Sequence, residues 1–215
     1  MLTGKHQSPL SGQEPKQLVI LLHGLGANAD DLFSLIPYFS DILPDAHFTS
    51  LDAPYPCDMA AFGLQWFSLQ DRSEEAIISG IEEVMPALNH YIDEAVKEHG
   101  LEDGDVALIG FSQGAMLSKY TAVRRSKPIA GVLAYSGALV GAKDLKDHIV
   151  SKPPVCVVHG EEDEVVPFEA FSESVNGLQA AGVEVHGYSR EDLGHGIDPA
   201  GVQIGREFLK TAFAS

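Results

Sequence analysis

Short apolar runs alternate with segments of helical periodicity along this chain of 215 residues. Several of these runs are apolar throughout, which is typical of strands that helices cover on both faces. The predicted strands are Gln17–His23, His47–Leu51, Asp105–Gly110, Ile129–Tyr135, Pro154–His159 and Val183–Tyr188. Because the strands and helices alternate, right-handed crossovers and an open, mostly parallel α/β sheet are expected.

The helices are predicted from apolar residues at helical spacing. The clearest series is Ile77, Ile81, Val84, Leu88 and Ile92. Asp71 and Glu74 before it resemble a capping box, Gly100 is a stop signal, and Pro86 should kink or split the helix. Further helices are expected at Asp31–Ile42, Gln113–Arg124, Phe168–Ala181 and Gly201–Phe213.

The length fits a single domain over residues 1–215, with residues 1–16 as an irregular or edge segment. No secretory signal is visible at the N-terminus, and the longest apolar run, Leu18 to Leu22, is too short to span a bilayer. Two cysteines cannot build a disulfide framework. A soluble protein of the reducing cytoplasm, without integral membrane association, is the simplest expectation.

The formal net charge is −17. A field of this sign repels phosphate backbones and anionic lipid surfaces, so nucleic acid is not an expected partner. It also disfavours tightly held anionic substrates. Otherwise the charge indicates only solubility.

A nucleophile is indicated by the sequence Gly110-Phe111-Ser112-Gln113-Gly114, which lies between a predicted strand and a predicted helix. In this G-x-S-x-G context the serine occupies a strained turn that exposes its Oγ above the sheet edge. The flanking glycines let strand and helix pass closely. The pattern alone is common, but its strand–helix context predicts a nucleophilic serine at position 112.

A serine needs a histidine to accept its proton and an acid to orient that histidine, in the chain order Ser, acid, His. Of the four histidines after Ser112, His195 is favoured because flanking glycines place it in a loop after the last strand. His148, His159 and His186 lie in a polar segment or in predicted strands.

The acid comes from the run Glu161-Glu162-Asp163-Glu164, which follows the strand ending at His159. Three of these four are expected to be solvated turn residues. Asp163 is favoured because Val165-Val166-Pro167 begins a segment expected to be buried, which would draw Asp163 inward. Part of this choice rests on the resemblance described below.

The loop His23-Gly24-Leu25-Gly26-Ala27 follows the first long strand. The backbone amides of Leu25 and Gln113 can form an oxyanion hole, and His23 is expected to shape this loop rather than react. The same loop offers an alternative. Gly24-x-Gly26-x-x-Ala29, with Asp52 ending the next strand, also resembles a dinucleotide fingerprint and would indicate an NAD-linked oxidoreductase. That alternative leaves Ser112, Asp163 and His195 unexplained.

With these residues placed, the chain resembles the small carboxylesterase and acyl-protein thioesterase family of α/β-hydrolases, also called phospholipase/carboxylesterases. The resemblance runs from about Leu18 to the C-terminus. Its carriers are Leu22-His23-Gly24-Leu25-Gly26, Ala53-Pro54, Trp66-Phe67, Gly110-Phe111-Ser112-Gln113-Gly114, His159-Gly160-x-x-Asp163-x-Val165-Val166-Pro167 and Gly194-His195.

The resemblance implies a compact α/β-hydrolase without a large cap, acting on esters or thioesters of small molecules or acylated proteins. It implies the triad Ser112, Asp163 and His195 with an acyl-enzyme intermediate, oxyanion donors at Leu25 and Gln113, and no cofactor. Members are often homodimers. The family usually reads Trp-Phe-Asp where this chain has Trp66-Phe67-Ser68. Because large aromatic side chains are usually buried, Trp66 and Phe67 are expected either to line an acyl pocket or to pack in the core.

Two other functions are less favoured. A non-catalytic binding protein of this fold would be expected to have lost part of the triad or of the oxyanion loop. A metal-dependent hydrolase would be expected to show a His-Glu-x-x-His motif or a Cys/His cluster, and no such spacing occurs in the sequence.

Overall fold

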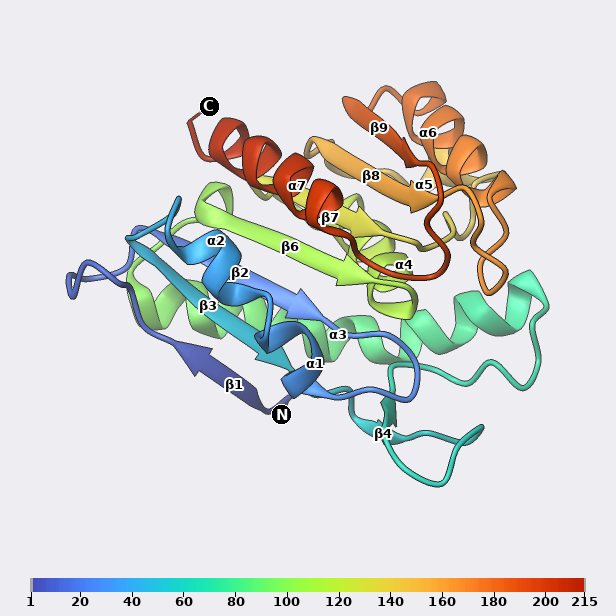
Figure 1. The fold of residues 1–215 in the computed structure, drawn as a ribbon, viewed down its shortest axis with the longest axis horizontal. Helices are drawn as coiled ribbons and strands as arrows, with labels where there is room; N and C mark the ends of the chain where they lie inside the picture. Colours follow the sequence, from blue (N-terminus) through green and yellow to red (C-terminus); the bar gives the residue numbers. More distant parts are fainter. Residues whose placement is uncertain (1, 215) are drawn as a thin grey trace.

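The computed structural model describes residues 2–214, and its centre is a seven-stranded sheet (Figure 1). The strand order is β1-β3-β2-β6-β7-β8-β9, and every neighbouring pair is parallel except the antiparallel pair of β1 and β3. The strands are β1 (Gly4–Gln7), β2 (Gln17–Leu22), β3 (Ala46–Leu51), β6 (Val106–Phe111), β7 (Gly131–Tyr135), β8 (Val155–Gly160) and β9 (Val185–Arg190). The mostly parallel α/β sheet and all six predicted strands are confirmed.

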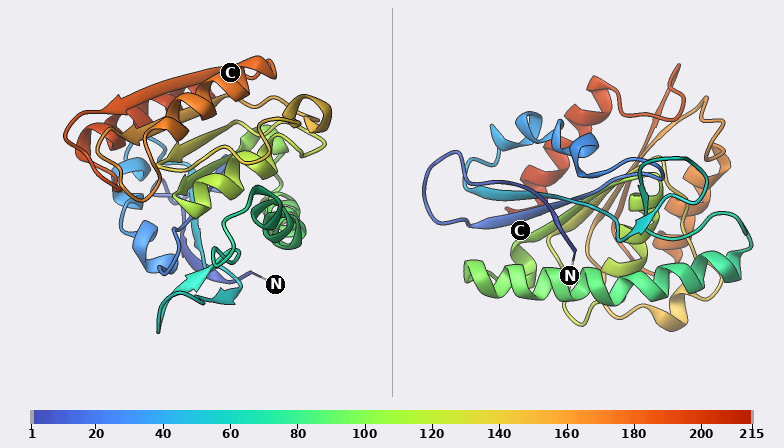
Figure 2. Two further views of the ribbon diagram at one scale, coloured as in Figure 1. Left: turned by 90° about the vertical axis from the view of Figure 1, so that its right-hand side faces the viewer. Right: turned by 90° about the horizontal axis from the view of Figure 1, so that it is seen from below.

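Helices cover both faces of this sheet (Figure 2). One layer contains α3 (Glu74–His99), α4 (Gln113–Ala122), α5 (Leu145–His148) and α6 (Glu169–Ala180). The other contains α1 (Ala29–Phe33), α2 (Ile36–Ser40) and α7 (Pro199–Ala212). Strand β2 explains the continuous apolar runs, because Leu18 and Ile20 face the first layer while Val19 and Leu21 face the second.

The structure also contains smaller elements beyond the six predicted strands. Strand β1 lies at the sheet edge within the opening segment, for which an irregular or edge conformation was expected. A separate two-stranded sheet, β4 (Tyr55–Pro56) with β5 (Leu64–Gln65), and a 3₁₀ turn at Asp103–Asp105 were not predicted. Residues 1 and 215, the ends of the predicted domain, lie outside the described residues.

The segment expected to form one helix over Asp31–Ile42 forms two five-residue helices, α1 and α2. Pro37 lies in the first turn of α2. A proline has no amide hydrogen to donate and is accommodated at a helix start, so a new helix begins here instead of one helix continuing.

Helix α3 also differs in detail from its prediction. It continues through Pro86 as one helix of 26 residues and is not split. Its N-cap is Ser73, whose hydroxyl accepts from the amide of Ala76, whereas Asp71 accepts from the amide of Ser73. The predicted stop is confirmed: Gly100 has φ 66°, the left-handed conformation that glycine adopts without a Cβ clash.

Candidate active site

Ser112 occupies the turn between β6 and α4, at the carboxyl end of a central strand. Its backbone has φ 54° and ψ −115°, a conformation that is unfavourable for a residue with a Cβ. The tight strand–helix passage explains why this conformation persists. A Cβ on Gly114 would overlap the carbonyl oxygen of Leu22, and a Cβ on Gly110 would overlap the backbone of α4. The predicted strained turn at Ser112 is therefore present.

His195 and Asp163 are brought together by the loops that follow β9 and β8. The Nδ1 atom of His195 lies 2.8 Å from Oδ2 of Asp163. The two loops pass at Gly160, where a Cβ would overlap the carbonyl oxygens of Leu193 and Gly194. The amide of Glu162 also donates to the Leu193 carbonyl at 2.9 Å. The absence of a side chain at Gly160 thus lets the histidine loop reach the acid.

Asp163 differs from its acidic neighbours in burial. Its side chain is inaccessible to solvent, whereas Glu161, Glu162 and Glu164 are exposed. The reason is not the expected burial of the following segment, because Val165 is 63 % exposed. Instead, Oδ1 of Asp163 accepts hydrogen bonds from the amides of Val165 and Val166 at 2.9 and 2.8 Å.

These contacts also determine the charge of Asp163. Burial alone would raise the pKa of its carboxyl group. Hydrogen bonds from His195 and from the amides of Val166 and Val165 outweigh burial, and the pKa lies below its ordinary value. Asp163 is therefore an anion beside His195 at neutral pH.

A cavity of about 320 Å³ lies between the serine turn and the loop that carries His195. Ser112, His195, Leu25 and Gln113 all contribute to its lining. The ring of His195 lies 4.8 Å from that of Phe111, the residue before the serine. The remaining lining is largely apolar, with one cation, and comes from Gly24, Leu69, Arg72, Ile77, Phe111, Met116, Ala138, Val165, Val166 and Pro167.

Most of these apolar lining residues were not predicted. They come from the loop before α3, from α3 and α4, and from the loops after β7 and β8, which are far apart in the sequence. For Ile77 and Met116 the available signal was their position, since each lies in the first turns of a helix. Their side chains face the site only because of how α3 and α4 pack.

The two expected oxyanion donors lie on this cavity. Among the described residues, the amides of Leu25 and Gln113 donate to no carbonyl in the turns and loops, whereas the neighbouring amides of Gly26 and Ser112 do. His23 shapes the loop as expected. It is fully buried, with Nδ1 2.7 Å from the Gly24 carbonyl and Nε2 accepting from the Ala53 amide at 3.1 Å.

Trp66 and Phe67 belong to the core rather than to this cavity. Both are buried, at 0 and 2 % exposure, and neither contributes to the lining. Their backbone holds the Gln113 side chain instead: its Oε1 accepts from the Trp66 amide at 2.8 Å, and its Nε2 donates to the Phe67 carbonyl at 2.6 Å. Ser68, which replaces the usual aspartate, accepts from the amide of Gln70.

The alternative dinucleotide site is not supported by the geometry of its acid. Asp52 accepts a hydrogen bond from the amide of Ala29 at 2.8 Å, at the start of α1. Its carboxylate therefore occupies the helix start where a pyrophosphate would be expected in that motif. Helix α1 itself is only five residues long.

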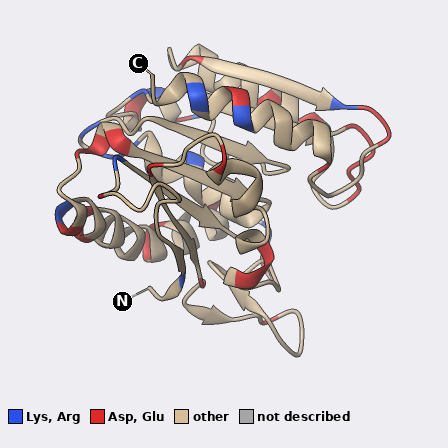
Figure 3. Ribbon diagram, turned by 60° about the vertical axis from the view of Figure 1, so that its left-hand side comes forward, with Lys and Arg blue, Asp and Glu red and all other residues tan. Residues whose placement is uncertain are grey.

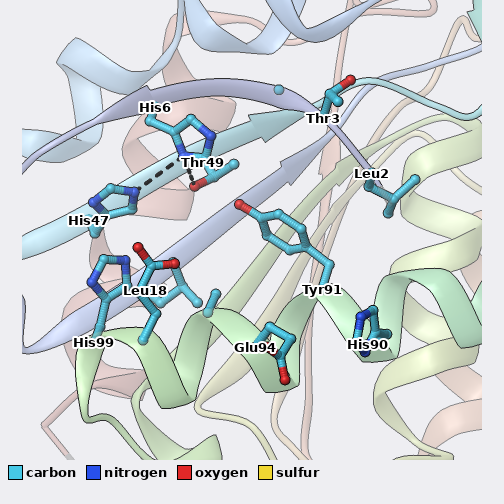
Figure 4. Close-up of a pocket in the computed structure, with 13 residues that line it drawn as sticks. Leu2, Thr3, His6, Leu18, His47, Thr49, His90, Tyr91, Glu94 and His99 are labelled. Carbon is cyan, nitrogen blue, oxygen red and sulfur yellow. Dashed lines mark hydrogen bonds between the residues drawn. The ribbon is translucent and has the colours of Figure 1, made fainter.

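A larger cavity, of about 550 Å³, lies away from Ser112, between β1, β3 and α3 (Figure 4). Three of its histidines form a row: the rings of His6 and His47 are 5.6 Å apart, and those of His47 and His99 are 4.5 Å apart. It contains neither the serine nor the acid, so its size does not make it the better candidate for hydrolysis.

The fold and the strained serine turn are those of an α/β-hydrolase. This chain belongs to the phospholipase/carboxylesterase family, whose family model matches residues 9–213. It is 29 % identical over 204 residues to esterase YpfH of Escherichia coli, covering 95 % of this chain and 85 % of that protein. It is 33 % identical over 129 residues to acyl-protein thioesterase 1 of Aspergillus fumigatus, covering 56 % of this chain and 54 % of that protein.

The crystal structure of esterase PE8 is similar over nearly the whole chain. Its TM-score is 0.93 at 34 % identity, covering 98 % of this chain and 99 % of that one. Across residues 2–214, no helix is both long and apolar enough to cross a bilayer.

Proposed function

We propose that this protein is a serine hydrolase that cleaves carboxylic esters or thioesters through Ser112, His195 and Asp163. One observation carries the proposal. A serine held at positive φ at the start of α4 shares a cavity with a histidine whose other ring nitrogen is bonded to a buried carboxylate. Membership of the phospholipase/carboxylesterase family supports the same reaction.

The tautomer of His195 follows from its partner. An ionised carboxylate only accepts hydrogen bonds, so Nδ1 of His195 carries a hydrogen and Nε2 keeps a free lone pair. In the proposed acylation step, Ser112 Oγ attacks the carbonyl carbon and Nε2 takes the hydroxyl proton. The carbonyl oxygen becomes an oxyanion, which the amides of Leu25 and Gln113 stabilise.

Collapse of this intermediate breaks the bond to the alcohol or thiol, which leaves with the proton from His195. Water then repeats the sequence on the acyl-serine: His195 takes a proton from water, the hydroxide attacks, and Ser112 leaves with that proton. The acid product and the free serine are released. Throughout, Asp163 remains an anion that stabilises the imidazolium.

The cavity favours a small substrate. Its volume of about 320 Å³ and its lining by Leu69, Ile77 and Met116 suit a short or medium acyl chain. One relative is named an esterase and another an acyl-protein thioesterase, so an alcohol and a thiol are both proposed as leaving groups.

We further propose that residues 1–215 act as one domain and that the protein is a homodimer. Light scattering on the purified chain measures its oligomeric state.

Ser112→Ala tests the nucleophile. The variant should keep the wild-type melting temperature but lose esterase turnover and labelling by a fluorophosphonate probe. Ser172→Ala, which removes an exposed hydroxyl on α6, is the matched control and should label like wild type. Full labelling of Ser112→Ala would place the nucleophile elsewhere. A hydrolysis panel crossing acyl length with oxygen-ester, thioester and phospholipid leaving groups then defines the substrate.

A further inference from the structure

A second histidine contacts the acid of the proposed triad. His159 lies near the end of β8 and is completely buried. Its Nε2 atom is 2.9 Å from the carbonyl oxygen of Val166 and 3.3 Å from Oδ2 of Asp163. The hydrolytic steps described above do not use this residue.

The partners of His159 determine its hydrogen position. Both neighbours of Nε2 are acceptors, so the hydrogen lies on Nε2 and is shared between the Val166 carbonyl and the Asp163 carboxylate. The other ring nitrogen, Nδ1, is buried and has no partner among the described residues. A second proton there would create a buried N–H without an acceptor.

His159 is therefore neutral. Burial lowers its pKa, and the positive charges that Lys119 and His195 carry when protonated lower it further, against the opposite effect of the Val166 carbonyl and the Asp163 carboxylate. Lys119 is itself fully buried on α4, where its Nζ donates to the Gly137 carbonyl and to Ser174 Oγ. A neutral donor can hold a carboxylate without competing with His195 as its counter-ion.

Asp163 is thus surrounded by N–H groups on both oxygens. The amides of Val165 and Val166 hold Oδ1, while the imidazoles of His195 and His159 share Oδ2. Three of these four donors come from the strand and loop that carry Asp163. His159 is the one of those three that acts on the oxygen facing His195.

We propose that His159 is a positioning residue for the hydrolytic reaction. Its Nε2–H holds Oδ2 of Asp163 toward His195, and its bond to Val166 fixes the loop whose amides hold Oδ1. This inference rests on the proposed function, because it acts through the Asp163–His195 pair. Without His159, the carboxylate can turn away from His195, and the imidazolium formed during acylation loses part of its stabilisation.

The test compares His159→Leu, which has no donor, with His159→Gln, whose side-chain amide places an N–H near the original Nε2. For a neutral ester, His159→Leu should lower kcat by about tenfold to a hundredfold, as for other groups that orient a catalytic side chain, with KM unchanged. The acid limb of its pH–rate profile should move to lower pH. His159→Gln should recover most of kcat. Equal losses in both variants would overturn the proposal.

A double-mutant cycle separates positioning from a general structural effect. In the Asp163→Asn background, His159→Leu should change kcat by less than about threefold, because its effect passes through the carboxylate that is already gone. A loss there equal to that in wild type would show that His159 acts on something else. Ile92→Ala, in the core of α3 far along the helix from the cavity, controls for reduced stability and should keep the wild-type pH profile.

The same cycle distinguishes the two proposals. If Asp163→Asn keeps kcat within tenfold of wild type, the proposed triad is wrong and His159 has nothing to position. If Asp163→Asn loses activity while His159→Leu stays within threefold of wild type, only the inference about His159 is wrong.

Discussion

Positions 161 to 164 are all acidic, yet the third alone faces inward. Two consecutive amides, of Val165 and Val166, bond to Asp163 and turn its side chain toward His195. Which of the four acids contacts His195 therefore depends on backbone geometry, because the neighbouring residues are also acidic.

This arrangement predicts unequal effects of neutralising each acid. Asp163→Asn should lower kcat steeply, by about 10⁴-fold as in the serine proteases, because the imidazole loses both its orientation and its counter-ion. Glu161→Gln, Glu162→Gln and Glu164→Gln should each change kcat by less than about tenfold. Steady-state kinetics of the four variants measure this. A collapse in a glutamate variant, with Asp163→Asn active, would reassign the acid.

At the scale of elements, a row of histidines, His6, His47 and His99, connects the edge strand β1, strand β3 and the end of α3. His6 Nδ1 bonds to Thr49 Oγ1 at 3.0 Å, and His47 Nε2 lies 3.4 Å from the same nitrogen (Figure 4). Burial, with His99 and His6 beside it, lowers the pKa of His47 to about 4, against the opposing effect of Glu98. Glu94 and His90 also line this cavity.

The row of histidines predicts that the free energy of unfolding depends on pH through His47, which lies away from the proposed catalytic site. An unfolded chain takes up a proton on His47 near pH 6.5, but the folded chain resists it until about pH 4. The contribution of His47 to the free energy of unfolding is therefore constant above about pH 6.5 and falls as the pH drops toward 4. Because His47 is only half-buried, the loss should be about 1 kcal/mol, less than the full shift would give.

Urea denaturation at pH 7, 6 and 5 measures this effect. His47→Gln, which stays neutral, should lose less stability than wild type over the same range, and the difference between the two curves isolates the histidine. Parallel curves would show that the row carries no such linkage.

For the whole molecule, acidic residues exceed basic ones by 17, and the loop that follows the arrowhead of β9 is among the acidic segments (Figure 3). The loops after β8 and β9, which carry Asp163 and His195, add four exposed acids: Glu161, Glu162, Glu191 and Asp192. Arg72 is a cation within the cavity lining itself. At distances beyond the cavity, the summed field is negative and opposes the approach of an anion.

We therefore expect a neutral ester to exceed an anionic ester of equal acyl length in kcat/KM, with a gap that depends on salt. Raising the ionic strength from about 0.01 to 0.1 M shortens the Debye length from about 30 to 10 Å, so kcat/KM for the anionic ester should rise while that for the neutral ester stays constant. A preference for the anionic ester that weakens with salt would instead show that Arg72 dominates the field.

The sequence by itself determined the parallel sheet, the serine turn and the choice of His195 as a candidate base. Each of these depends on local patterns: continuous apolar runs, glycines two residues either side of Ser112, and glycines flanking His195. The buried strands could be predicted because a strand that helices cover on both faces is apolar at nearly every position.

Only the tertiary structure decided which groups meet. It placed Trp66 and Phe67 in the core, interrupted the predicted helix before Pro37, and brought His159 within 3.3 Å of the oxygen of Asp163 that faces His195. A side chain's partners depend on how separate loops pass one another, as the loops after β8 and β9 do at Gly160. No local pattern encodes that crossing, because its two sides are more than thirty residues apart in the chain.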